Sequence, residues 1–327
     1  MKPAFLVSLN SDTLEFKTRG TTISLTDNGG FQADELSITV ADPDSRIELP
    51  RKGVQLGLQL GWHHPDGPKV VDKGRFTVDE LQYSINPRTI TIVACSANFR
   101  KALVKVQNKS WRDTTVTEIV SEIAKNHKLI PSVDARYDSR VIDHLDQANE
   151  SDGHLLTRLA LLLGAITNVK NNYLIFMPKG QGITPGGTVL QVQTIDVSQL
   201  TAASYAEVDR NSQFTGAKAK WRDTDKNKIT WEVAGDPTNT QRLKPLFASQ
   251  SEAQTAADTQ WQQQRQGEFS LEISLAVGRP ELITETPVQT TGIKPEIDAK
   301  NWIVESVSHE ISDGGYVTAA TLITKSE

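Results

Sequence analysis

Similar patterns of apolar and polar positions occur twice in this chain of 327 residues, once around residue 80 and once near residue 310. Each copy opens with an aromatic residue, Phe76 or Trp302, and continues as an alternating strand, a polar loop and a second alternating strand. In both copies the alternation changes parity at the same spacing, near Asp79 and near Glu305. A parity change predicts a β-bulge, which bends a strand as a barrel wall requires. The pattern predicts two similar barrel-like modules, and the alternative is that two unrelated hairpins look alike.

The N-terminal third of the chain predicts short antiparallel strands. We expect strands at 5–9, 36–40 and 54–60, where apolar residues cluster or alternate with polar ones. Clusters of Asp, Asn, Gly and Pro separate these segments and predict turns. Short strands at this spacing indicate a sandwich or barrel, so residues 1–105 are expected to form a first barrel-like domain.

A helical pattern begins after residue 106. Thr115 followed by Glu118 matches a capping box, which marks the start of a helix. Apolar residues then recur at the spacing of one helical face. The residues of this face are Val116, Ile119, Val120, Ile123 and Ala124.

A second helix is expected to begin at Ser151 and to end at Gly164, because glycine commonly terminates helices. The residues that follow, 165–177, predict a hairpin, and the stretch 134–143 is expected to bridge the two helices. Residues 106–182 are therefore interpreted as a small α/β module inserted between two β regions.

From residue 183 to the end the chain returns to a β pattern. Strands are expected at 214–221, 228–233 and 269–275, ahead of the second copy of the hairpin pattern. We expect residues 183–327 to form a second barrel-like domain. The predicted fold class is mainly β, with two barrel-like β domains and a small inserted α/β module.

A third helix is predicted within this last region. It is expected to begin at Ser251, with Gln254 completing a capping box, and to stop at Gly267. The segment is rich in Gln and Ala, with Trp261 as its main apolar anchor. We expect this helix to pack on the second barrel-like domain.

Charge and cysteine content restrict the possible environments and partners. The formal net charge is −5, from 35 basic and 40 acidic residues, which disfavours specific binding to nucleic acid. The single cysteine, Cys95, allows no disulfide within the chain, as is usual for a protein of a reducing compartment. We find no signal peptide and no apolar run long enough to cross a membrane. We therefore expect synthesis in the cytoplasm and no membrane insertion by this chain.

The sequence predicts no metal site. His63 and His64 with Asp66 fall in a predicted hairpin tip, and a solvated turn explains them better than a metal. Asp223 begins a run that resembles a calcium loop, but the sixth position is Lys228 instead of Gly and the twelfth is not Glu. A polar β-turn is the better interpretation.

Catalytic and cofactor motifs are also missing from the sequence. The glycine-rich stretch 180–187 follows a strand, but no helix follows it and its glycine spacing does not match a dinucleotide fingerprint. Cys95 lies in an apolar strand, which favours a structural role over a nucleophilic one. A carboxylate pair for glycoside cleavage is left open, but no residue points to one. We nominate no catalytic, cofactor-binding or metal-binding residue, and we expect no cofactor and no enzyme activity.

Four stretches, in order along the chain, carry a resemblance to a known family. They are 27–36 with 74–80, 110–115, 146–164, and a discontinuous set comprising 269–271, 278–280, 284–288, Trp302 and 307–309. In them the chain resembles the phage late control gene D protein family, the baseplate hub of contractile-tailed phages. Related hubs occur in R-type bacteriocins and in the N-terminal part of VgrG proteins. None of the stretches is a catalytic motif.

The resemblance implies a structural hub made in the host bacterial cytoplasm and incorporated into the tail baseplate of a virion or phage-tail-like particle. Three chains with two barrel-like domains each would form a ring of six similar units, matching a six-fold tail tube and a three-fold spike. The implied partners are two further copies of the chain, the tail tube protein, the central spike protein, and possible contacts with the tape-measure protein and other baseplate proteins. The resemblance leaves the assembly-interface residues unknown.

The resemblance also has departures and alternatives. Some relatives have a long basic insertion where this chain has only 236–245. Because the chain ends shortly after the last predicted strand, we expect no attached lysozyme, needle or effector. We also expect strand residues that face the lumen of the ring to be depleted in Lys and Arg. The alternative functions are a cell-wall-degrading enzyme and a type VI-like puncturing component.

Overall fold

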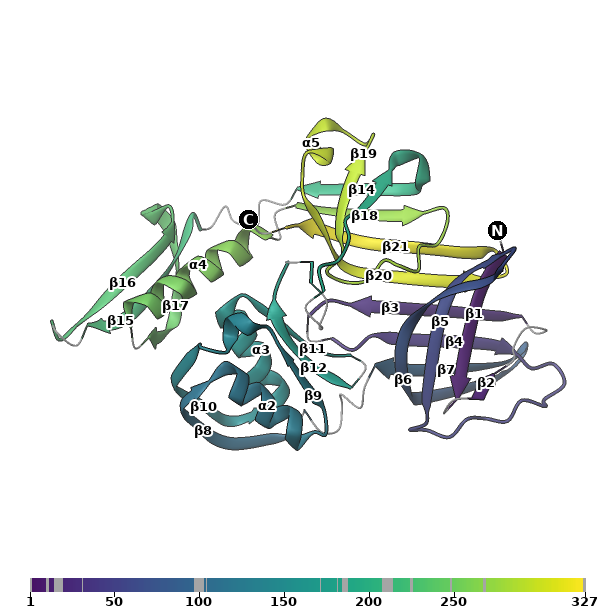
Figure 1. Ribbon diagram of the computed structural model, residues 1–327, viewed down its shortest axis with the longest axis horizontal. Coiled ribbons are helices and arrows are strands. Elements are labelled where there is room, and N and C mark those ends of the chain that lie inside the picture. Colours follow the sequence, from purple (N-terminus) through teal and green to yellow (C-terminus); the bar gives the residue numbers. More distant parts are fainter. Residues whose placement is uncertain are drawn as a thin grey trace.

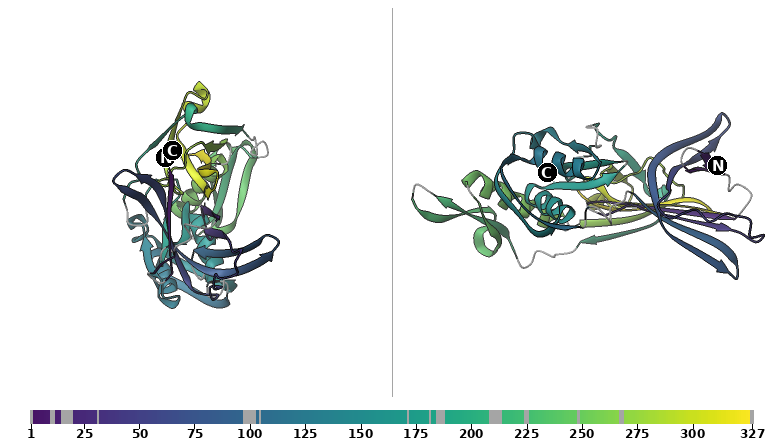
Figure 2. Two further views of the ribbon diagram at one scale, coloured as in Figure 1. Left: turned by 90° about the vertical axis from the view of Figure 1, so that its right-hand side faces the viewer. Right: turned by 90° about the horizontal axis from the view of Figure 1, so that it is seen from below.

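The computed structural model describes residues 2–9, 12–14, 20–30, 32–96, 103, 105–170, 172–180, 182–183, 188–207, 214–223, 226–247, 249–266 and 269–325. Its secondary structure is mainly β, with a mixed α/β module between two β regions of the sequence, as predicted. The molecule is elongated, with N-terminal strands at one end and a small unit of helix and sheet at the other (Figure 1 and Figure 2).

One 13-stranded sheet spans both β regions, and its main path runs β14-β18-β21-β20-β3-β4-β7-β6-β5-β1-β2 (Figure 1). The N-terminal strands are β1 (Lys2–Leu9), β2 (Asp12–Leu14), β3 (Thr21–Asn28), β4 (Glu35–Ala41), β5 (Gln55–His64), β6 (Gly67–Ile85) and β7 (Arg88–Ser96). The C-terminal elements are β13 (Gln193–Asp196), η2 (Val197–Gln199), β14 (Leu200–Glu207), β18 (Phe269–Leu275), β19 (Pro287–Thr291), α5 (Pro295–Asp298), β20 (Trp302–Ser312) and β21 (Gly315–Thr324). The predicted strands at 5–9, 36–40, 54–60 and 269–275 are confirmed.

The strand order repeats within this sheet. The strands β3-β4-β7-β6, which we call the first quartet, have the same order as β14-β18-β21-β20, the second quartet. Each quartet ends in a hairpin with a register shift, between Val78 and Glu80 in β6 and between Val304 and Ser306 in β20. Both predicted bulges are therefore confirmed, at equivalent places.

Strands β3 and β20 join the two quartets by antiparallel pairing, from Ile23 opposite Ile311 to Asn28 opposite Ser306. The alternating apolar side chains of the first quartet form one buried cluster, which also contains Ile311 and Tyr316. A second cluster lies against the second quartet around Trp302, which is 1% exposed. The C-terminal hairpin thus completes the N-terminal core, so the two β regions share buried apolar surface.

The inserted module contains two helices and two small sheets. Its elements are β8 (Val106–Thr115), α2 (Val116–Asn126), β9 (Ile130–Val133), η1 (Ala135–Tyr137), β10 (Val141–Ser151), α3 (Asp152–Leu163), β11 (Ala165–Lys170) and β12 (Tyr173–Pro178). The predicted capping box is present, since the Glu118 N–H donates to Thr115 Oγ1 at 3.2 Å and the Thr115 N–H donates to Glu118 Oε2 at 2.8 Å. Gly164 ends α3 with a φ of 62°, as its position predicted.

The connection between the two helices contains regular structure. The stretch 134–143 lies between α2 and α3, as expected, and it holds η1 and the start of β10, which pairs with β8. The strand β9 just before it pairs in parallel with β12. Strand pairing between distant segments depends on cross-strand packing, which the pattern of one segment does not reveal.

A separate three-stranded sheet lies at the far end of the molecule (Figure 1). It contains β15 (Gly216–Asp223), β16 (Lys228–Gly235) and β17 (Thr240–Phe247), with η3 (Pro237–Asn239) before β17. The predicted strands at 214–221 and 228–233 correspond to β15 and β16, and most of the short segment 236–245 forms η3 and β17.

The helix α4 (Gln250–Gln266) covers this small sheet, whose strands lie within the predicted domain 183–327, and its buried residues form a cluster separate from that of the second quartet. Ala253, Ala256 and Ala257 are buried against the sheet, because small side chains let a helix approach closely. The helix also begins earlier than expected, since the Glu252 N–H donates to Ser249 Oγ at 3.3 Å. The expected stop at Gly267 lies outside the described residues.

The proposed division of the chain at 105/106 and 182/183 stays a prediction. Along the described part of the chain, no helix has the length and apolar character that crossing a lipid bilayer requires.

Candidate functional site

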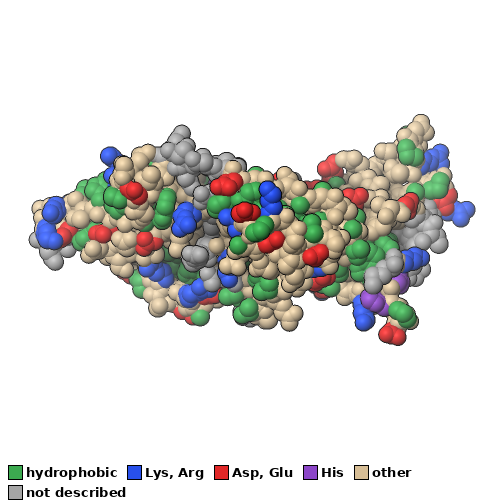
Figure 3. All heavy atoms as spheres, turned by 90° about the horizontal axis from the view of Figure 1, so that it is seen from above, with side chains coloured by type: hydrophobic (Ala, Val, Ile, Leu, Met, Phe, Trp, Pro, Cys, Tyr) green, Lys and Arg blue, Asp and Glu red, His purple; other side chains and the backbone are tan. Residues whose placement is uncertain are grey.

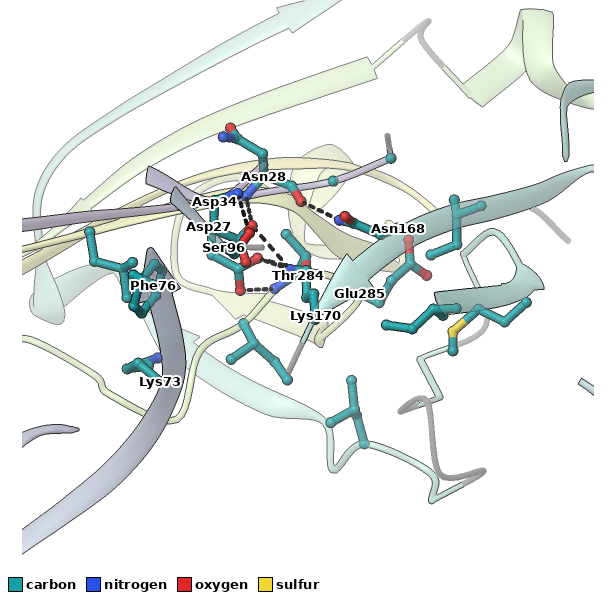
Figure 4. A pocket seen from close by; sticks show the side chains of 18 of the residues that line it. Asp27, Asn28, Asp34, Lys73, Phe76, Ser96, Asn168, Lys170, Thr284 and Glu285 are labelled. Atoms are coloured by element: carbon teal, nitrogen blue, oxygen red, sulfur yellow. Dashed lines mark hydrogen bonds and ion pairs between the residues drawn. The ribbon is translucent and has the colours of Figure 1, made fainter. Parts of the chain in front are cut away.

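A buried ionic cluster lies where the inserted module meets the main sheet (Figure 4). Lys170, at the end of β11, places its Nζ 3.3 Å from Asp34 Oδ1 and also forms an ion pair with Asp27 Oδ1 on β3. The Thr284 N–H donates to Asp27 Oδ2 at 3.1 Å. The lysine of the module thus contacts carboxylates of the first quartet, and the loop before β19 closes the same cluster.

Backbone groups complete the hydrogen bonding of this cluster. The Asn28 N–H donates to Asp34 Oδ1 at 3.0 Å, and the Asp34 N–H donates to Ser96 Oγ at 2.8 Å. Nearby, the Gly180 N–H donates to Glu285 Oε2 at 2.7 Å. These bonds tie the ends of β3 and β7 and the segment after β12 to one junction.

Burial and charge set the protonation of the cluster. Burial raises the pKa of Asp34 to about 6, although the Lys170 charge opposes this shift. Burial would also raise the pKa of Asp27, but the charge and hydrogen bond of Lys170, with the Thr284 N–H and Lys73, leave that pKa lowered. Burial would lower the pKa of Lys170, but the two carboxylates outweigh it and leave that pKa raised. A charged lysine therefore holds at least one charged carboxylate at neutral pH.

A second network surrounds His309 on β20. Its Nε2 lies 3.0 Å from Lys73 Nζ, and its Nδ1 lies 3.0 Å from both Thr318 Oγ1 and the Tyr316 hydroxyl. Lys73 Nζ also donates to the Leu282 carbonyl at 3.2 Å. His309 Nε2 also lies 3.1 Å from the Leu282 carbonyl oxygen, so this nitrogen contacts both a lysine ammonium, which donates, and a carbonyl oxygen, which accepts.

The same network keeps His309 neutral. Burial, followed by the nearby Lys73 charge, lowers the pKa of His309 to about 3. Burial likewise lowers the pKa of Lys73 to about 8. At neutral pH the network therefore consists of a neutral imidazole held by a mostly charged lysine.

These polar groups are poorly placed for catalysis. Tyr316 and Thr318 are each 1% exposed and His309 is 0% exposed, so a substrate cannot reach their shared hydrogen bonds. A cavity of about 230 Å³ is lined by charged residues of the cluster, including Asp27 and Lys170, and by apolar side chains, including Leu25, Ile166 and Met177. Within the described ranges, no three His, Cys, Asp or Glu side chains gather closely enough to hold a metal ion. The junction is built to hold three parts of the chain together.

Some of the residues weighed in the sequence as chemical candidates lie apart from this junction, whereas Cys95 directly precedes Ser96 of the cluster and Gly180 donates to Glu285 beside it. His63 and His64 end β5, next to the turn that leads into β6. The Asp223 carboxylate accepts from the Lys226 N–H at 3.0 Å, as in a polar turn. Cys95 is half-buried in β7. In the stretch 180–187, residues 181 and 184–187 lie outside the described residues.

Sequence reasoning missed the two lysines of the junction. The pattern of the predicted hairpin 165–177 places Lys170 in its turn, and no motif of the sequence marks Lys73. The stretches 27–36, 284–288 and 307–309, which carry the family resemblance, meet at the junction and were the available signal. A lysine ending the strand 165–170 would have been a further signal, because a charged residue beside a buried strand needs a partner.

The sheet has a second feature of functional interest, a polar face turned away from the apolar clusters. In β3 and β18 this face is formed by the even-numbered residues, and in β4, β7 and β21 by the odd-numbered residues. In β6, β14 and β20 it is formed by the even-numbered residues that follow the register shift of each strand. Each of these positions is described, and together they include no Lys or Arg. The acidic residues of this face are Glu35, Glu80, Glu272 and Glu310.

Elsewhere, acidic and basic side chains are interspersed. Figure 3 shows both signs distributed along the visible face of the molecule, without a continuous basic area. A protein that binds nucleic acid directly would present clustered Lys and Arg. The geometry thus provides a rigid junction, a polar sheet face with an acidic bias, and a sheet whose strand order repeats.

Comparison with known proteins connects these features to a family. The family model described as "Phage tail baseplate hub (GPD)" matches residues 90–315. The chain is 34% identical over 368 residues to the probable baseplate hub protein of Escherichia phage 186, covering 99% of this chain and 94% of that protein. It is 33% identical to the probable baseplate hub protein of Escherichia phage P2, covering 98% and 93%.

A solved structure agrees on the fold. The 43 kDa tail protein of prophage MuSo2 from Shewanella oneidensis has a TM-score of 0.70 at 15% identity, with 99% of each chain covered. The family model covers more than half of the chain, and the two relatives extend over nearly all of it, including the junction and both quartets. The chain therefore belongs to the phage tail baseplate hub family.

Proposed function

We propose that this chain is a structural baseplate hub, three copies of which form a ring that joins the tail tube to the central spike. The observation that carries the proposal is the repeat of two quartets within one sheet. Three chains with two quartets each supply six similar units. Such a ring presents approximate six-fold symmetry to the tube while keeping true three-fold symmetry for the spike.

The polar face of the quartets supports a role as the wall of the ring. Its acidic residues and its lack of Lys and Arg would let DNA or a tape-measure protein pass without electrostatic attachment. The apolar clusters on the opposite side keep the sheet rigid. We propose that this face lines the lumen.

The same reasoning gives the partners and the location. The ring would contact the tail tube protein on one side and the spike protein on the other, with further contacts to baseplate proteins. Assembly would place it in the tail of a virion after synthesis in the host bacterial cytoplasm. The role requires no catalysis, in keeping with a buried junction whose groups bond to one another.

Solution mass and reconstitution test this proposal. Light scattering across a concentration series should give about 108 kDa, three times the chain mass of 36.0 kDa, either alone or after mixing with spike protein. Electron microscopy of the complex with tube and spike should show the chain between the two. A chain that never forms trimers under either condition, or that degrades purified peptidoglycan, would contradict the proposal.

A further inference from the structure

We infer that the seam between neighbouring copies is an antiparallel pairing of the second half of β6 with β14 of the next copy. Its register is the one that β20 and β3 already have inside each chain. This inference rests on the proposed ring and names the surface that closes it.

The equivalence of the quartets fixes which residues correspond. Aligning the bulges places Val78 on Val304, after which Leu81 matches Val307, Tyr83 matches His309 and Ile85 matches Ile311. These are the equivalent positions of β6 and β20. Within the chain, β20 pairs with β3 of the other quartet. The equivalent residues of β6 should therefore pair in the same way with a quartet of a neighbouring copy.

The opposite side of the seam follows in the same way. Registers through β4 and β18 place Ile23 on Ala203 and Leu25 on Tyr205, so β14 is the equivalent of β3. Inside the chain, β3 pairs with β20. By equivalence, β14 is expected to receive β6 from a neighbouring copy.

Both edges are available in the single chain. Strand β14 ends the sheet, and β18 is its pairing partner among the described strands. Strand β6 pairs with β5 only up to Thr77, and over 80–85 it pairs with β7 on one side alone within the described residues. Strands at the open edge of a sheet pair readily with further strands.

Exposure differs sharply between equivalent residues. At the internal join, His309 is 0% exposed and Ile311 is 3% exposed. Their equivalents at the open edge, Tyr83 and Ile85, are 43% and 66% exposed. The same structural positions are thus buried where the sheet continues and exposed where it stops, which indicates that a strand is missing there.

The composition of the two edges favours pairing. Natural sheets block their exposed edges with Lys, Pro or inward charges. Neither 80–85 nor the β14 range Leu200–Glu207 contains Lys, Arg or Pro. In the inferred register Tyr83 lies opposite Tyr205 and Ile85 lies opposite Ala203, so apolar side chains meet on the core side of the seam.

Disulfide cross-linking tests the register. In a Cys95→Ala background, Gln82→Cys with Ala206→Cys places both thiols opposite each other on the polar face. Directly opposed residues have Cα atoms about 4.5–5.5 Å apart, within the range that a disulfide bridges. The control, Ser84→Cys with Ala206→Cys, uses the same face two residues out of register.

Each outcome is read together with the solution mass. A trimeric mass with intermolecular disulfides in the first variant, at least about fivefold more abundant than in the control, supports the seam. A trimeric mass with equal or absent cross-linking overturns the seam and leaves the ring proposal standing. A monomeric mass without cross-links at every concentration, both alone and after mixing with spike protein, overturns the seam and also counts against the ring.

A charge placed at the seam gives an independent test. Ile85→Lys should weaken trimer formation about tenfold or more, because the ammonium would be desolvated between copies. The side chain is exposed in the single chain, so folding should not change. The matched control is Ile229→Lys on β16, where the isoleucine is 55% exposed and lies away from both edges. Equal trimer formation by the two variants would refute the inferred seam.

Discussion

Replacement of the junction lysine should destabilise the docking of the inserted module. The change Lys170→Met removes the positive charge between Asp27 and Asp34 and leaves two buried carboxyl groups without their direct ion-pair partner. Removing one partner of a buried ion pair typically costs about 3–5 kcal/mol. Because the Lys170 side chain is 24% exposed, we expect the lower end of this range, about 3 kcal/mol at pH 7.

The effect should depend on pH. Burial raises the pKa of Asp34 to about 6, so at pH 5 this carboxyl is mostly protonated in the folded protein and Lys170 retains mainly Asp27 as its partner. The cost of Lys170→Met should therefore be smaller at pH 5 than at pH 7. Urea unfolding at both pH values, followed by fluorescence and by limited proteolysis, would measure the cost and show whether the module is released first.

Two controls make the interpretation specific. Lys125→Met removes an exposed lysine from α2 of the same module and should change stability by no more than about 0.5 kcal/mol. The triple variant with Asp27→Asn and Asp34→Asn added to Lys170→Met should recover much of the loss, because it leaves no unpaired buried charge. If Lys170→Met is as stable as Lys125→Met at pH 7, the cluster does not hold the module as argued.

Two further predictions concern buried groups near the same junction. The pKa of Asp34 is raised from 3.8 to about 6, so its contribution to stability is present below pH 3.8 and is lost as the pH rises through 6. The pKa of His309 is lowered from 6.5 to about 3, so its contribution to stability is present above pH 6.5 and is lost as the pH falls toward 3. Asp34→Asn should therefore lose about 2 kcal/mol more than the parent protein when acidified from pH 6 to pH 4, and parallel urea midpoints for the two proteins would contradict this. Gly278→Ala should cost about 1–3 kcal/mol, since the added methyl would lie 2.4 Å from the buried Tyr316 ring. Gly20→Ala, whose added methyl meets only a side chain at 3.9 Å, is the control, and equal melting temperatures would refute the clash.

Local features of this protein follow from its sequence. The Thr115–Glu118 capping box, the stop at Gly164 and the two bulged hairpins depend on residues close together in the chain. Their geometry is set by backbone sterics and short-range hydrogen bonds, which a local pattern encodes directly. The repeat of two β modules was therefore predictable from the alternation of apolar and polar residues.

The tertiary structure alone decided how these parts combine. The alternation along β3 and β20 buries the correct face, but it does not specify that these two strands pair and turn two modules into one sheet. Likewise, a Gln-rich helix with an alanine face fits several sheets, and its place on β15 depends on which one lies within reach.

The ionic junction shows the same limit most clearly. Lys170 reads as a turn residue until the fold brings it to Asp27 and Asp34, more than a hundred residues earlier. Sequence by itself determined the strands, caps, bulges and the repeat, because each depends on neighbouring residues. Only the tertiary structure decided the pairing of distant strands, the buried charges and the open edges, because those depend on which surfaces lose water together when the whole chain folds.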